Sequence, residues 1–365
     1  MNNDTQNRPT ISDRLYMHRL YWECKEQPYP LAAFRVEEDF FFSRHFQAAR
    51  PFLVPGKRIT PEMLSVEDFL PDYERMFQVS EEVGQDAFWT AEPFTGIPWM
   101  EAILGCEICA GEESFISKPW LKDLREVDTI QLDPKNPWFQ KYLEFTEKLV
   151  ALSHGRFPVG MPIMRGPSDM VGALMGQTEM VYALTDEPKR MKQFFLKVTD
   201  IFLQVQEAQT NRIPPFFGGS ALGFYHVWCP GPSIWYQDDL SALLSPGMFR
   251  EFLAPTSRKI CEGFPYTAVH LHPASFFMLD EILSNNALKA VEVNKDVGGP
   301  TVEEMLPELK KILDKKNLIL WGDLSLQDLV CVRKNLPLRG LFFHIITPSM
   351  EKANELLAFI RSWRN

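Results

Sequence analysis

Two histidines one residue apart, His270 and His272, close an apolar stretch and stand directly before a proline. Because side chains alternate between the two faces of a strand, both imidazoles point the same way. Two neighbouring imidazoles at the end of a strand form a pair that can chelate a metal ion. A third histidine, His344, ends another apolar stretch further along the chain. We predict that the three imidazoles converge on one metal ion.

A structural role fits the same histidines. Buried imidazoles can orient loops through hydrogen bonds, and a single histidine such as His344 is more often structural than a ligand. Glu292 lies within an apolar stretch, where a carboxylate is costly to bury without a partner. Glu292 is therefore a candidate for a fourth ligand, a proton donor, or the ion-pair partner of Arg35 or Arg165.

Other charged residues also stand where apolar stretches end. Glu92, Asp238 and Asp239 are candidates for a general acid or base, with ion pairing as the plainer alternative. Arg35 and Arg165 are candidates for holding a carboxylate or sulfonate group of a substrate.

Two further sets of residues carry an ambiguous signal. Trp228 and Trp235 are candidates for the wall of an apolar ligand cavity, although core packing is the commoner role of a tryptophan. Cys106 and Cys109 form a C-x-x-C pair, but no second pair and no thioredoxin-like pattern accompanies them. We interpret this pair as coincidental, with a thiol role as the alternative.

Short apolar runs alternate with amphipathic stretches from about residue 29 onward, a pattern typical of a parallel sheet covered by helices. The runs predict strands at 31–35, 87–92, 157–164, 234–238, 266–272, 289–294, 317–323 and 340–346. The amphipathic stretches predict helices at 61–78, 138–153, 188–211, 246–263, 275–284, 302–315, 324–334 and 349–363. This alternation predicts a single α/β domain over residues 1–365, a (β/α)8 TIM barrel with its chemistry at the carboxyl ends of the strands. We expect residues 1–28 to form a helical extension. Residues from about 100 to 136 are expected to form an insertion over the barrel mouth, after the second strand.

Composition narrows the choice of partners. The 365 residues carry a formal net charge of -10, so nucleic acid and anionic membranes are poor partners. No apolar stretch reaches the roughly 18 residues of a membrane span, and the polar N-terminus lacks a signal-peptide core. Six cysteines without a dense spacing pattern indicate reduced thiols and a cytoplasmic location.

Three motifs give the chain a resemblance to a known superfamily. Residues 243–252 read LLSPGMFREF, residues 321–324 read WGDL, and residues 165–167 read RGP before an apolar helix. These stretches resemble motifs of the uroporphyrinogen decarboxylase superfamily, from about residue 11 to the end of the chain. That superfamily includes tetrapyrrole decarboxylases. It also includes zinc-dependent, corrinoid-linked methyltransferases that move methyl groups from methanol or methylamines to coenzyme M.

The decarboxylase branch is matched only in part. Its arginine-rich first-strand signature corresponds here to Arg35 followed by acids at 37–39, which would repel a polycarboxylate. Glu92 and His344 stand near the branch's second-strand aspartate and last-strand histidine. Its serine after the fourth strand falls on Asp239.

The methyltransferase branch holds zinc through a His-x-Cys pair at a strand end and a cysteine on the last strand. His270, His272 and, approximately, His344 occupy those positions in this chain. The exchange of two thiolates for neutral imidazoles raises the charge of the site by about two units and makes the metal a harder Lewis acid. Such a centre favours an oxygen ligand over a thiol.

The resemblance therefore implies a metal-dependent methyltransferase-like enzyme. Zinc would be held by His270, His272 and His344, with Glu292 at or near the ligand sphere. The partners would be a small-molecule substrate and a methyl-corrinoid carried by another protein, and the enzyme would be a monomer or homodimer. A tetrapyrrole decarboxylase (a carboxy-lyase) is the alternative. A non-catalytic barrel that binds a corrinoid or a partner protein is the third possibility.

Overall fold

The computed structural model describes residues 8–36, 45–112 and 114–363. Within them a parallel six-stranded sheet forms the centre of the molecule, in the order β1-β11-β10-β9-β8-β7. Its strands are β1 (Leu31–Val36), β7 (Ser233–Gln237), β8 (Tyr266–Leu271), β9 (Ala290–Asn294), β10 (Asn317–Gly322) and β11 (Leu341–Thr347). Most of their residues are buried, as expected for parallel strands with helices on one face and a packed interior on the other.

Two irregular segments continue the ring from the edges of this sheet. Ala91 bridges Val159, and Arg165 bridges Gln237 of β7, both in parallel. The N–H of Ala87 donates to the carbonyl of Ala32 in β1 at 3.4 Å. Residues 87–92 and 157–165 thus occupy the two remaining strand positions, and the predicted TIM-barrel-like fold class is confirmed.

Those two segments are not the regular strands that the sequence predicts. Pro158 and Pro162 have no N–H to contribute to a ladder of hydrogen bonds. The N–H of Thr90 donates instead to Nδ1 of His226 at 3.0 Å. A side chain inside the barrel therefore takes the place of a strand partner.

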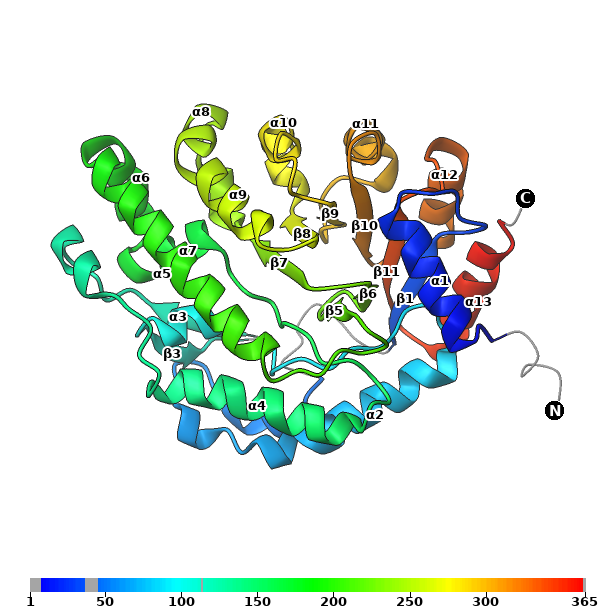
Figure 1. The fold of residues 1–365 in the computed structure, drawn as a ribbon, viewed down its shortest axis with the longest axis horizontal. Coiled ribbons are helices and arrows are strands. Elements are labelled where there is room, and N and C mark those ends of the chain that lie inside the picture. The colour runs from blue at the N-terminus through cyan, green and yellow to red at the C-terminus, as the bar shows by residue number, and fades with distance from the viewer. Residues whose placement is uncertain (1–7, 37–44, 113, 364–365) are drawn as a thin grey trace.

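Helices cover the outside of the ring (Figure 1). Each predicted helix corresponds to an observed one, with bounds that differ by at most five residues in seven of the eight. These are α2 (Val66–Val83), α4 (Pro137–Ser153), α7 (Pro188–Thr210), α9 (Ala254–Glu262), α10 (Leu279–Leu283), α11 (Val302–Leu313), α12 (Leu326–Asn335) and α13 (Met350–Arg361). The N-terminal extension contains α1 (Ile11–Trp22), and further helices are α3 (Trp99–Ile103), α5 (Pro167–Met175), α6 (Gln177–Asp186) and α8 (Pro246–Met248). The predicted helix 246–263 is instead divided into α8, a π-helical turn (Phe249–Leu253) and α9.

The segment expected as an insertion forms a small antiparallel sheet. Strands β3 (Glu107–Ala110) and β4 (Phe115–Lys118) pair with each other, and β3 also pairs with β2 (Arg58–Ile59). Phe115 lines the cavity described below. The insertion thus contributes a wall at the mouth.

A hairpin that the sequence analysis does not predict occupies the interior. Strands β5 (Ser220–Leu222) and β6 (Val227–Cys229) precede β7 and lie within the ring in Figure 1. We call residues 220–229 the core hairpin. Its tip residues are buried against the inner faces of the strands: the Phe224 ring lies 5.1 Å from that of Trp321, and the Tyr225 ring 4.8 Å from that of Trp235.

Two glycines allow the core hairpin to enter. A Cβ on Gly160 would lie 2.6 Å from Cα of Gly223, and a Cβ on Gly223 would lie 2.3 Å from the carbonyl oxygen of Met161. Contacts this short exclude any side chain at either position. The backbones of the hairpin and of segment 157–165 therefore touch directly.

None of the described helices has both the length and the apolar character that crossing a bilayer requires. The acidic residues 37–39, expected to repel a polycarboxylate, lie outside the described residues.

Candidate metal centre

Three side chains at the carboxyl ends of β7 and β8 form a group that can hold a metal ion. Asp239, His270 and His272 each offer a ligand atom, and these atoms lie within 4.8 Å of one another. The two imidazole rings are 4.5 Å apart between centroids. Gln237 pairs with His270 in the register of the two strands, so the chain leaving β7 brings Asp239 to the histidine pair.

Each imidazole binds a carboxylate through its Nδ1 atom. His270 Nδ1 is hydrogen-bonded to Oε2 of Glu292, and His272 Nδ1 lies 2.7 Å from Oδ1 of Asp296. A carboxylate only accepts, so Nδ1 carries the hydrogen and Nε2 is left as the ligand atom. Nε2 of His270 lies 3.8 Å from Oδ1 of Asp239. A carboxylate behind each ligating histidine is the usual second layer of a zinc centre, so these residues fit a metal.

Glu292 is completely buried on β9. Its Oε2 accepts a hydrogen bond from the Tyr225 hydroxyl at 2.9 Å, whereas its Oε1 has no hydrogen-bond partner among the described residues. Burial lowers the pKa of His270, but the nearby carboxylates of Glu292, Asp239 and Asp296 outweigh it and raise that pKa to about 9. This concentration of negative charge attracts a cation, either a proton or a metal ion.

His344 is not part of this group, contrary to the predicted convergence of three imidazoles. Its Nε2 accepts a hydrogen bond from Nε of Arg35 at 3.3 Å, and its ring lies 5.2 Å from that of His226. Burial, followed by the charge of Arg35, holds the pKa of His344 well below its ordinary value. Asp239, expected as an acid or base, takes the third position instead.

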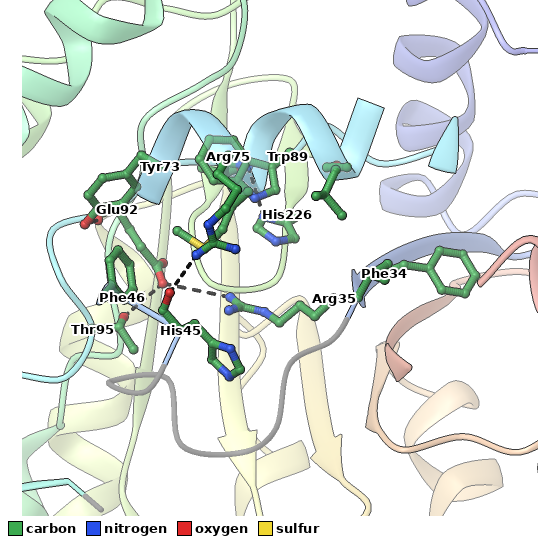
Figure 2. Close-up of a pocket in the computed structure, with 15 residues that line it drawn as sticks. Phe34, Arg35, His45, Phe46, Tyr73, Arg75, Trp89, Glu92, Thr95 and His226 are labelled. Carbon is green, nitrogen blue, oxygen red and sulfur yellow. Dashed lines mark hydrogen bonds and ion pairs between the residues drawn. The ribbon is translucent and has the colours of Figure 1, made fainter. Parts of the chain in front are cut away.

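Arg35 and Glu92 point toward each other beside a small cavity of about 50 Å³ (Figure 2). Nη2 of Arg35 lies 4.0 Å from Oε1 of Glu92 and donates to the carbonyl of Phe224 at 3.1 Å. Glu92 also accepts from the Thr95 hydroxyl at 2.9 Å. A space of this size holds a water molecule or two, not an organic substrate.

Asp238 and Arg165 also have protein partners. Asp238 accepts from the backbone N–H and the hydroxyl of Ser168, both at 2.7 Å, and burial raises the pKa of Asp238 to about 7. Nη1 of Arg165 donates to Oε1 of the fully buried Glu101 at 2.7 Å. Asp238 therefore secures the start of α5, and Arg165 is paired within the protein.

The two tryptophans expected in a cavity wall pack inside the core. Trp228 donates to the carbonyl of Phe216 at 2.8 Å and Trp235 to that of Met161 at 3.3 Å. Both are almost completely buried, and the tryptophan at the cavity is Trp321.

Cys106 and Cys109 are both buried and free. Burial raises the pKa of the Cys106 thiol to about 12, which leaves it unreactive. A metal or redox role of this pair finds no support here.

A cavity of about 350 Å³ opens beside Asp239, His270 and His272. Its size suits a small organic ligand. We call it the mouth cavity, and its other lining residues are Thr95, Gly96, Ile97, Pro98, Ser114, Phe115, Ile163, Arg165, Phe224, Tyr225, Gln237, Asn294 and Trp321.

The fold resembles that of a solved structure, a methyltransferase from Methanosarcina mazei. The two chains are 14% identical, the match covers 97% of this chain and 98% of the other, and the TM-score is 0.61. A likeness at this identity establishes the shared fold. No protein-family model and no curated protein sequence matches the chain.

Proposed function

We propose that the protein is a metal-dependent, methyltransferase-like enzyme that moves a methyl group between a corrinoid, or a small methyl donor, and a small acceptor. Zinc would be held by Asp239, His270 and His272. The observation that carries the proposal is the carboxylate behind each histidine, because it occupies Nδ1 and leaves Nε2 as the ligand atom of a ring that lines the mouth cavity. The shared fold with a methyltransferase supports the choice of reaction.

The chain's own residues would orient and enclose the reactants. Glu292 and Asp296 fix the two imidazoles, and the rings of Trp321 and Phe115 form an apolar part of the cavity wall. Zinc with two neutral imidazoles and one carboxylate would act as a Lewis acid toward an oxygen or nitrogen atom of the acceptor or donor.

The decarboxylase alternative has less support. A tetrapyrrole with many carboxylates needs several free cations, yet Arg35 faces Glu92 and Arg165 is bound to Glu101.

Elemental analysis of the purified protein tests the metal centre. We expect about one zinc per chain after loading, and loss of that zinc in Asp239→Ala, His270→Ala and His272→Ala. His344→Gln is the matched control and should keep its metal. Retention of zinc in the first three variants, or its loss in His344→Gln with the fold intact, would refute the ligand set.

Methyl transfer is tested with the zinc-loaded protein and methylcobalamin. The absorbance of the methyl-corrinoid should change only when a small acceptor is present, and the change should disappear in His272→Ala. Metal-free protein that consumes uroporphyrinogen would establish the decarboxylase instead.

A further inference from the structure

We propose that the mouth cavity binds a neutral or positively charged ligand that donates a hydrogen bond to Oδ1 of Asn294, and that it rejects anions. The inference rests on the proposed function, since it assigns a ligand class to the same site. The sequence led us to expect that Arg35 and Arg165 hold a carboxylate or sulfonate group of the substrate. The present proposal replaces that expectation.

Asn294 presents an acceptor that the protein leaves unused. The residue is the last of β9, is 3% exposed and lines the mouth cavity. Its Nδ2 donates to Oδ1 of Asp296 at 2.6 Å, and a carboxylate cannot donate in return. The amide orientation is therefore fixed, and Oδ1 has no hydrogen-bond partner among the described residues. A buried acceptor of this kind destabilises the protein until a donor reaches it.

A second unused acceptor lies on the same face of β9. Glu292 precedes Asn294 by two residues, so both side chains point into the barrel. Oε2 of Glu292 is occupied by Tyr225 and His270, while Oε1 is buried without a partner among the described residues. Glu292 does not itself line the mouth cavity, so it adds negative charge behind the wall, and Oδ1 of Asn294 is the acceptor offered to a ligand.

The charge of the centre disfavours an anion. Three carboxylates lie beside the two histidines. Asp239 and Glu292 lie next to His270, and Asp296 lies next to His272. Zinc brings two positive charges, so three carboxylates leave the loaded centre negative. Arg165 is the one lysine or arginine among the described lining residues, and its charge is offset by Glu101 at 2.7 Å. An anionic ligand would therefore be repelled by the centre.

The walls suit the apolar body of such a ligand. Trp321, Phe115 and Ile97 line the cavity, and the face of an indole also attracts a cation. Together these features fit a small amine or alcohol with an apolar skeleton.

Three probes of nearly equal size test the charge preference: benzylamine, benzyl alcohol and benzoate. Their dissociation constants are measured near neutral pH by calorimetry, or by NMR of the ligand where binding is weak, on zinc-loaded and metal-free protein. We expect benzylamine to bind at least about tenfold more tightly than benzoate, with benzyl alcohol between them. Benzoate that binds as tightly as benzylamine in either form overturns the proposal.

Two variants test the role of Asn294. Asn294→Leu should weaken benzylamine and benzyl alcohol by about tenfold and leave the weak binding of benzoate unchanged. Asn294→Asp keeps the shape and adds a charge, so it should strengthen benzylamine and weaken benzoate further. Asn335→Asp, which adds the same charge at an exposed position on α12, is the control. Unchanged affinities in both Asn294 variants would overturn the assignment.

Metal content measured on the same samples separates the two proposals. A preference for benzylamine in protein that takes up no zinc would refute the metal centre and leave the ligand class standing. Stoichiometric zinc together with a preference for benzoate would refute the ligand class and leave the metal centre standing.

Discussion

Two pairs of histidines lie inside this barrel, and their partners differ. His270 and His272 each bind a carboxylate, and the pKa of His270 is raised to about 9. His226 and His344 lie beside Arg35 instead, and burial followed by that positive charge holds the pKa of both well below the ordinary value. Side-by-side imidazoles are therefore not enough for a metal centre. The group behind each ring decides whether a cation is attracted or repelled.

The largest expected effect comes from removing a carboxylate from the first pair. Glu292→Gln should lower zinc affinity by about 10–100-fold, because the amide no longer stabilises the hydrogen on Nδ1 of His270. Competition with a chromophoric chelator measures the affinity. Glu92→Gln, on the arginine side, is the control, and equal losses in both variants would contradict the distinction between the pairs.

The next effect concerns the core hairpin, which carries Tyr225 toward one pair and His226 into the other. Gly223→Ala places a Cβ 2.3 Å from the carbonyl oxygen of Met161. We expect the free energy of unfolding to fall by about 1–3 kcal/mol, measured by urea denaturation. Gly247→Ala meets only the Ser245 side chain at 3.8 Å and should change stability little. A fully stable Gly223→Ala protein would show that the hairpin is not held as closely as described.

The second pair should destabilise the protein in acid. Because the folded-state pKa of His226 and of His344 is lowered, the unfolded chain binds more protons below about pH 6.5. Above that pH the free energy of unfolding is not reduced by these histidines. Below it, the free energy of unfolding declines as the pH falls, by up to about 1.4 kcal/mol per pH unit for each histidine.

Urea denaturation of chelator-treated protein between about pH 7 and 5 measures this slope. In His344→Gln the stability should decline less steeply than in the unmodified protein. An unchanged slope would mean that His344 is protonated in the folded state and resembles the first pair.

The smallest expected effect is that of the Tyr225 hydroxyl, which donates to Glu292 and lies 3.3 Å from Nδ1 of His270. Tyr225→Phe should weaken zinc binding by a few-fold, less than Glu292→Gln, because it removes one net hydrogen bond of about 1 kcal/mol. Tyr236→Phe loses a buried hydrogen bond to Ser257 at 2.6 Å and is the matched control. A loss of affinity in Tyr236→Phe as large as in Tyr225→Phe would point to a general loosening of the barrel.

The helices and most strands could be predicted because their signals are local. Apolar runs such as those of β8 and β11 are buried on both faces, and alternation alone places His270 and His272 on one side. Local patterns could not show whether His344 lies close enough to the other two histidines to share a metal ion. It depends on the register of β11 with β10, where His344 pairs with Trp321, and on the approach of Arg35.

The remaining surprises arise from contacts between distant parts of the chain. Asp239 joins the histidines only because β7 lies next to β8. The core hairpin has strands of three residues, too short for a periodic signal, and its entry depends on the contact between Gly160 and Gly223. Its Thr90–His226 hydrogen bond also explains why segment 87–92 is irregular.

The link between α1 and the core hairpin extends the influence of the N-terminal helix to the mouth. Trp22 of α1 donates to the carbonyl of Trp228 at 2.8 Å, and three residues earlier in the hairpin Tyr225 reaches Glu292. A change in the position of α1 thus has a short path through this hairpin to Glu292. We therefore expect a substitution in α1, none of whose residues lines the mouth cavity, to change the zinc affinity of the proposed centre.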